Sequence, residues 1–270
     1  MTATVIDSSA VPRVNPVACT AAVARRVALM TLRNPQVIVM SVLQSVVFLL
    51  IFRYVFGGAI ASDGLRYVDF MVPGILTVGM VFSVMGVGPA MAEDLQRGIV
   101  DRFRSLPMPR SAVLAGRALG AHALTAVTAA VTFAVAFAVG FRVHHGIAGL
   151  VAMVGLCLLT AVAFTWVFIA LGLATGDVQA AQGLGFLVLP LSFVSSAYVP
   201  VDTMPGWLRI FAEYQPLTVV IEANRYLTQG TAGLGGFQQS GSYYVAAAVV
   251  WCLGILVVAV TASAALFRRR

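Results

Sequence analysis

Lysine is absent from this sequence, and charged residues of any kind are scarce. The 270-residue chain has 17 basic residues, all of them arginine, and 10 acidic residues, so that charged residues make up 10% of it. A soluble domain is about a quarter charged. Hydrophobic residues make up 60% of the chain, and its mean hydropathy is +0.95. A soluble fold cannot bury this much apolar surface, and we therefore expect lipid to surround the chain.

The absence of lysine also excludes one nucleotide site. The GxxxxGK[ST] loop that binds ATP phosphates requires a lysine, so ATP and Mg²⁺ are expected on a partner subunit, with no cofactor on this chain. Ionisable residues are rare within the apolar runs, where Arg53, His122 and Asp177 lie near ends or turns. Proton-driven pumps keep such groups at membrane depth, which argues against a proton antiporter.

Cysteine is also scarce, and no enzyme motif is visible. Cys19, Cys157 and Cys252 are far apart and show no disulfide or metal-site spacing. Neither a GxSxG nor an HExxH motif occurs. Ser195 and Ser196 are more typical of helix packing than of a nucleophile, and no charged ring marks an ion pore. The chain is therefore predicted not to be an enzyme, with an intramembrane enzyme or a passive channel as minor alternatives.

Long, continuous apolar runs favour membrane-spanning helices. A membrane β-barrel alternates apolar and polar residues in segments of about 10, whereas a spanning helix needs about 20 apolar residues. We predict an all-α polytopic membrane protein with one transmembrane domain over residues 1–270. Its six predicted spans are 36–56, 70–92, 113–140, 149–175, 179–199 and 244–267.

The arginines are distributed unevenly between the loops. Most lie in the N-terminal tail, in the loop after the second span and at the C-terminus, which six spans place on one side. Because basic loops stay in the cytoplasm, both termini are predicted to be cytoplasmic. The basic residues are all arginine, and Ala, Val and Gly are abundant, which suggests a GC-rich coding genome. We therefore predict a bacterial protein in the plasma membrane.

Two segments outside the spans are predicted to be helical. Residues 17–34 match an amphipathic helix on the inner leaflet, and the alternative is a disordered basic tail. The outer segment 200–243 is predicted to form short helices that begin near Pro205 and Pro216, and the alternative is an exposed loop. Glu222 and Arg225 are three residues apart, so they can pair on one helix.

A dense group of charges, Met91–Arg117, interrupts the apolar sequence. Its apolar residues Leu95, Ile99, Phe103 and Leu106 are spaced as one helical stripe. Gly98 is expected to permit close backbone approach. Such a helix can place its stripe in a groove on a soluble partner, or it can pack on the inner leaflet. The charged remainder of the predicted docking helix comprises Glu93, Asp94, Arg97, Asp101, Arg102 and Arg104.

Two motifs resemble the permease subunit of ABC-2 type exporters. The first is present as Glu93, Gly98, Arg104, Ser105-Leu106-Pro107, Arg110 and Gly116-Arg117. The second is the stretch LPLSFVSSAYVPVDTMPGWLRIFAEYQPLTVVIEANRYL, which begins at Leu189. Within the family, the sequence looks most similar to the daunorubicin-resistance permeases.

This resemblance implies an ATP-driven exporter of a hydrophobic or amphipathic drug or lipid. It implies that residues 17–34 form a connecting helix, that the charged group is a coupling helix docked on the ATPase, and that the outer segment is a re-entrant helix pair. The implied partners are two separate ATPase subunits, a second permease copy or sister permease, and membrane lipids, with no nucleic acid. Export of a lipid-linked glycan is the main alternative.

A substrate pathway is expected between the second and fifth spans of two permease copies, as the resemblance implies. Large, adaptable apolar side chains suit an amphipathic substrate, although ordinary helix packing is the more common role of such residues. The candidate lining residues are Phe82, Met85, Phe186, Leu189 and Phe193.

Overall fold

The computed structural model describes residues 15–57, 65–99, 109–234 and 239–269, and these ranges contain helices and no strand. Within these ranges, five helical segments are long and apolar enough to cross a bilayer. They are α2 (Pro35–Ile51) with η2 (Phe52–Phe56), α3 (Tyr67–Val84) with α4 (Val87–Gln96), α6 (Arg110–Ala138), α7 (Gly146–Thr175) and α12 (Gly241–Arg269). The prediction of an all-α, polytopic membrane protein is confirmed.

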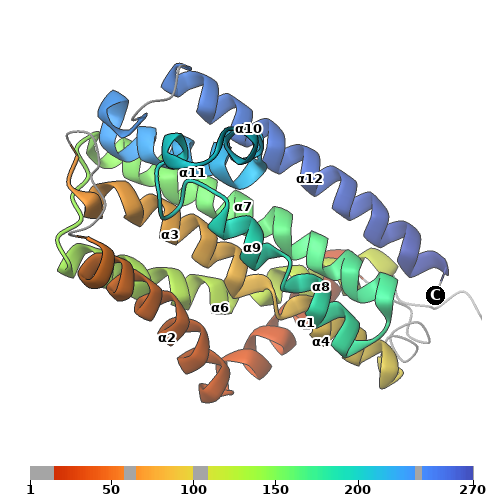
Figure 1. The fold of residues 1–270 in the computed structure, drawn as a ribbon. Coiled ribbons are helices and arrows are strands. Elements are labelled where there is room, and N and C mark those ends of the chain that lie inside the picture. Colours follow the sequence, from red (N-terminus) through yellow and green to blue (C-terminus); the bar gives the residue numbers. More distant parts are fainter. Residues whose placement is uncertain (1–14, 58–64, 100–108, 235–238, 270) are drawn as a thin grey trace, which may run out of the picture.

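Helix α3 is the centre of the bundle (Figure 1), where α2, α6, α7 and α11 (Pro216–Gln229) contact it. In the most apolar window of α3–α4, 78% of residues are buried, against 17% in α2–η2 and 17% in α12. The outer faces of α2 and α12 are therefore available to lipid or to another subunit.

The segment predicted as the span 179–199 is not one long helix. It forms α8 (Val178–Gly185) and α9 (Val188–Phe193), which are separated by a turn. Pro190 has no N–H group to donate to the carbonyl of Phe186, and the N–H of Leu189 donates to that carbonyl instead, at 3.0 Å. Proline thus accounts for the break.

This broken segment nevertheless runs the length of the central helices. At one end, Gln96 at the end of α4 donates to the carbonyl of Gly176, just before α8, at 3.2 Å. At the other end, the hydroxyl of Tyr67 at the start of α3 donates to the carbonyl of Tyr198 at 3.1 Å. Residues 176–198 therefore lie antiparallel to α3–α4.

The N-terminal helix α1 (Pro16–Leu32) packs against the first turns of α6. A Cβ added to Gly116 or Gly120 would lie 2.6 Å from the Cβ of Val23 or Val27, respectively. This small-xxx-small spacing lets two helix backbones approach closely. The predicted helix at residues 17–34 is present, and one of its faces covers α6.

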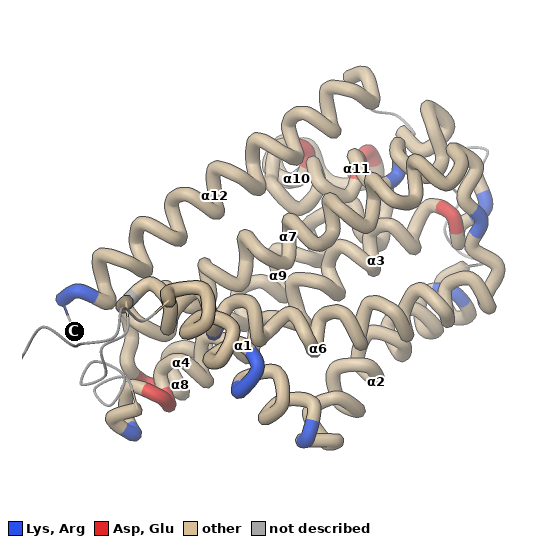
Figure 2. Tube along the Cα trace, turned by 180° about the vertical axis from the view of Figure 1, so that it is seen from behind, with Lys and Arg blue, Asp and Glu red and all other residues tan. Residues whose placement is uncertain are grey.

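The segment between α9 and α12 forms η3 (Val201–Thr203), α10 (Gly206–Tyr214), α11 and η4 (Gly230–Leu234). Pro205 precedes α10 and Pro216 opens α11, where the missing N–H group costs no helical hydrogen bond. Helix α11 is buried against α3, α7 and α12. Figure 2 shows the charged residues of the described chain near the two ends of the bundle.

Candidate functional site

The end of the bundle at which α4 ends is predicted to be cytoplasmic and is called the inner end; it contains the start of the predicted docking helix. Helix α4 ends at Gln96, and Gly98 follows with a φ of 65°. The N–H of Gly98 donates to the carbonyl of Leu95 at 3.1 Å, as at many glycine-terminated helix ends. The prediction of one uninterrupted helix from Leu95 to Leu106 is therefore wrong between Leu95 and Ile99.

Gly98 has a left-handed backbone conformation, which side chains other than glycine adopt at a cost. A Cβ built on it meets no atom within 4 Å among the described residues of this single chain. The close backbone approach expected where the docking helix meets a partner stays a prediction.

Charged residues at the end of α4 form two ion pairs, one of which joins α4 to α6. Asp94 forms an ion pair with Arg117 of α6, and Glu93 pairs with Arg97 at 2.5 Å. Arg97 and Glu93 remain 67% and 46% exposed, whereas Arg117 is 13% exposed. The first pair is thus a structural contact and the second a surface pair, which is worth at most about 1 kcal/mol.

Of the other predicted docking residues, the structure describes only Leu95 and Ile99. Leu95 is half-buried and packs against the core, and Ile99 is half-buried. The remaining five lie outside the described residues, namely Asp101, Arg102, Phe103, Arg104 and Leu106.

The candidate pathway residues lie at the end of α3 and along the neighbouring segment that holds α8 and α9. Phe82 and Met85 are at the end of α3, and a Cβ on Gly185 of α8 would lie 3.1 Å from the Met85 side chain. The rings of Phe193 and Tyr198 are tilted against each other, with their centroids 5.2 Å apart.

These elements together leave an apolar face on the single chain. Phe186 and Phe193 are each 47% exposed, and Leu189 is half-buried. The structure thus brings the α3 candidates close to the α8–α9 segment. Their role in transport stays a prediction.

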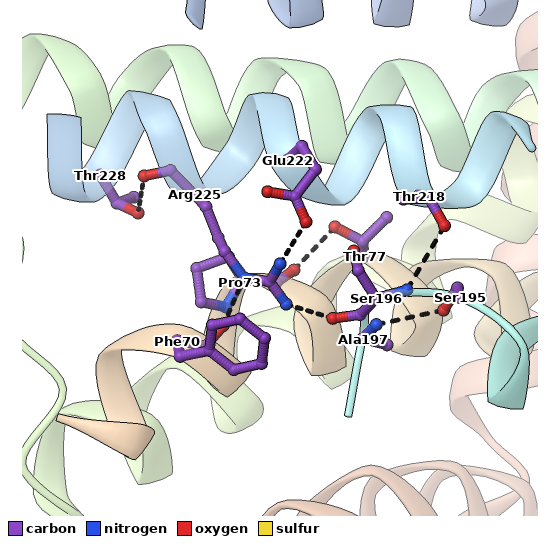
Figure 3. Close-up of polar contacts among 10 residues, drawn as sticks. All are labelled: Phe70, Pro73, Thr77, Ser195, Ser196, Ala197, Thr218, Glu222, Arg225 and Thr228. Carbon is purple, nitrogen blue, oxygen red and sulfur yellow. Dashed lines mark hydrogen bonds and ion pairs between the residues drawn. The ribbon is translucent and has the colours of Figure 1, made fainter. Parts of the chain in front are cut away.

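A buried polar network lies near the other end of the bundle (Figure 3). Arg225 of α11 is fully buried, and its guanidinium lies 3.6 Å from the ring centroid of Phe70. Its Nε donates to the Phe70 carbonyl at 2.7 Å, and its other nitrogens donate to Glu222 and to the Ser196 carbonyl. The predicted pair of Glu222 and Arg225 is therefore present and fully buried.

The network continues along α11 and unites three segments. Asn224 donates to Thr77 of α3 at 2.8 Å, and the N–H of Ser196 donates to Thr218 at 3.3 Å. Burial raises the pKa of the Glu222 carboxyl, and the nearby positive charge of Arg225 opposes that rise. Sequence reasoning found the local pair but missed Thr77 and Asn224, since no local spacing relates residues on different helices.

Comparison with known proteins identifies the family of this chain. The sequence profile described as ABC-2 type transporter matches residues 19–228. The chain belongs to the ABC-2 type transporter family. The matched range of this ABC-2 chain begins in α1 and ends in α11, and so includes both the inner end and the buried network.

The similar relatives of this ABC-2 chain are named as permeases. It is 33% identical to the daunorubicin resistance ABC transporter permease protein DrrB1 of Streptomyces coeruleorubidus over 193 residues, which are 71% of this chain and 68% of the relative. It is 25% identical to the putative transport permease ycf38 of Cyanophora paradoxa, over 72% of this chain and 69% of the relative.

A third relative agrees with these two. The probable doxorubicin resistance ABC transporter permease protein DrrC of Mycobacterium tuberculosis is 25% identical, over 66% of this chain and 63% of the relative. Together with the apolar helices, these matches make the ABC-2 chain a multi-pass membrane permease subunit of an ABC transporter.

Proposed function

We propose that this permease moves a hydrophobic or amphipathic drug out of the cell, driven by ATP that separate subunits hydrolyse. The observation that carries the proposal is its 33% identity to a daunorubicin resistance permease over most of both chains. ATP and Mg²⁺ are bound by the ATPase subunits, because the permease has no lysine for a phosphate-binding loop.

The proposed assembly has two permease and two ATPase subunits in a bacterial plasma membrane, with both permease termini in the cytoplasm. Large apolar side chains on α9 and on the turn before it support a second permease, because Phe186, Leu187 and Phe193 remain 47%, 62% and 47% exposed on one chain. In the proposed pathway, Phe82, Met85 and Leu189 join Phe186 and Phe193 between the two copies.

Reconstitution tests this function. The permease is co-purified with an ABC ATPase encoded beside its gene and placed in proteoliposomes that contain a fluorescent anthracycline. ATP should drive anthracycline movement, and an ATPase variant without its phosphate-loop lysine should not. Anthracycline movement by the permease alone would contradict the proposal and favour a passive channel.

The proposed ATPase contact is the segment that leaves α4 at the inner end. Phe103 is the largest apolar residue of the predicted stripe, and aromatic anchors in interfaces cost at least about 2 kcal/mol when truncated. Phe103→Ala should therefore weaken ATPase binding by about 30-fold. Arg97→Glu is the control, because this residue is 67% exposed and its pair with Glu93 contributes little. Equal ATPase binding by wild type and Phe103→Ala would exclude Phe103 as the anchor.

A further inference from the structure

A small cavity lies between α2 and α3, two of the helices that are long and apolar enough to cross the membrane. Its volume is about 30 Å³, and one water molecule needs about 10–15 Å³. It therefore has room for one small chemical group. Polar side chains from both helices line this α2–α3 recess, namely Ser41, Gln44 and Ser45 of α2 and Ser83 of α3.

Two of these four side chains have partners on α6. The hydroxyl of Thr132 donates to that of Ser45 at 2.9 Å, and the hydroxyls of Ser83 and Thr125 are 3.1 Å apart. A Cβ added to Gly79 would lie only 3.1 Å from the Ser45 hydroxyl. The contacts to α6 therefore hold one wall of the recess in place, and the glycine keeps the recess open.

The other two side chains, those of Ser41 and Gln44, form no hydrogen bond with any residue that the structure describes. Gln44 is exposed on the single chain and lies near the middle of the span Pro35–Phe56. Each membrane surface is about 15 Å from the bilayer centre, too far for a glutamine side chain to reach water there. Because an unpaired amide is unfavourable in hydrocarbon, we expect Gln44 to bond to a group outside this chain.

The rest of the recess is apolar and partly aromatic. Phe48 and Phe82 line it together with Tyr198, whose ring centroid is 6.4 Å from that of Phe48. No described residue that lines it is charged, so a carboxylate or an ammonium group would find no opposite charge. A hydroxyl or carbonyl group on a ring system matches both parts, since the polar side chains can bond to the group and the aromatic ones can contact the rings.

We propose that the α2–α3 recess binds a neutral hydroxyl or carbonyl group of the exported compound through the Gln44 amide and the Ser41 hydroxyl. This rests on the proposed export function and narrows its substrates to ring compounds that carry such groups. Among the five candidate pathway residues, Phe82 lines the recess. The recess thus adjoins the proposed pathway and adds α2 to it. A second permease copy is the competing partner for Gln44.

Cysteine accessibility tests whether the recess opens to water or to lipid. A permease without its native cysteines is assembled with the ATPase in proteoliposomes, and single cysteines are reacted with a small, charged thiol reagent. Gln44→Cys should react at least about fivefold faster than Leu43→Cys, because the reactive thiolate forms in water. Leu43 is 50% exposed on the same helix but does not line the recess. Equal reaction rates would overturn the proposal.

Transport kinetics test the contact with the substrate. Gln44→Leu should raise the anthracycline concentration for half-maximal transport about fivefold, the effect of one neutral hydrogen bond, and leave the maximal rate unchanged. Gln36→Leu is the matched control, because Gln36 is also exposed on α2 but does not line the recess. Equal half-maximal concentrations in the two variants would overturn the proposal. So would loss of the second permease from Gln44→Leu in native mass spectrometry, which would assign Gln44 to a subunit contact.

Protection by the drug separates failure of the recess from failure of export, because binding requires no transport. Saturating anthracycline should slow the labelling of Ser41→Cys, a variant that retains Gln44. Protection without transport by the wild-type complex would support the recess and contradict the export function. Transport without protection would support the export function and overturn the recess, and the absence of both would contradict both.

Discussion

At the scale of single residues, Arg225 is the most constrained charged group in the described chain. It is fully buried, and it contacts α3 through Phe70, the turn after α9 through Ser196, and Glu222 on its own helix. Removing one partner of a buried ion pair leaves an uncompensated charge, which costs about 3–5 kcal/mol. The surface pair Arg209–Glu213 on α10 offers a comparison, at 2.7 Å and with Arg209 42% exposed.

We predict that Arg225→Met lowers the free energy of unfolding by about 3–5 kcal/mol. Arg209→Met should lower it by at most about 1 kcal/mol, since water screens an exposed pair. Unfolding in mixed detergent micelles, followed by circular dichroism, measures both variants. Similar losses for the two would show that burial of Arg225 does not control its contribution.

A second residue-scale prediction concerns Gly98. Its φ of 65° is unfavourable for residues with a Cβ, and no described atom lies close enough to oppose a side chain. Gly98→Val should therefore destabilise this turn by about 1–2 kcal/mol, and Gly98→Asn by less, because asparagine tolerates the left-handed region. Stimulation of the partner ATPase by each variant reports the effect. An equal loss for Asn and Val would indicate that side-chain size, rather than conformation, matters here.

At the scale of helices, the contact between α1 and α6 depends on two glycines. Gly116 and Gly120 are four residues apart on one face of α6, directly under Val23 and Val27. A larger side chain at either position would push α1 away, because the adjacent atoms include the backbone of α1.

Gly120→Leu is therefore predicted to expose α1, and trypsin should then cleave after Arg25 and Arg26 at least several times faster. Gly155→Leu in α7 is the control, since a Cβ there meets no described atom within 4 Å. Timed proteolysis in detergent, read by mass spectrometry, compares the two. A cleavage rate unchanged from wild type in Gly120→Leu would contradict the tight packing of α1.

At the scale of the whole molecule, the positions of the helix ends predict the topology. Gln179 lies in α8 beside the end of α4, and Ser242 lies at the start of α12, after the segment that holds α10 and α11. Both side chains are exposed. The arginine distribution predicts that the α4 end faces the cytoplasm.

Single cysteines test this orientation in a variant that lacks Cys19, Cys157 and Cys252. Ser242→Cys should react with an impermeant maleimide in intact cells, whereas Gln179→Cys should react only after permeabilisation. The reverse pattern would invert the proposed orientation, and labelling of both in intact cells would contradict a bundle that separates these two ends.

Several features of this protein follow from the sequence by itself. Continuous apolar runs of about 20 residues with very few charges favour membrane-spanning helices, because a helix satisfies its own backbone hydrogen bonds where lipid offers no water. Glu222 and Arg225 pair because they are three residues apart on one helix. Pro205 and Pro216 mark the starts of α10 and α11 for an equally local reason.

Other features depend on contacts between distant segments. Arg225 meets Phe70 across 155 residues, and no spacing in the sequence relates the two. The break in the span predicted at 179–199 was foreseeable from Pro190, but its continuation beside α3 was not, because the contact of Tyr198 with Tyr67 defines that path.

The position of each helix in the bundle was also decided only by the tertiary structure. The most apolar windows of α2–η2 and α3–α4 have nearly equal hydropathy, 2.2 and 2.0, yet 17% of the first is buried and 78% of the second. Lipid chains are as apolar as the interior of a helix bundle, and so hydropathy brings a helix into the membrane without choosing its neighbours. Close packing and buried polar contacts, such as those of Gly116 and Arg225, make that choice.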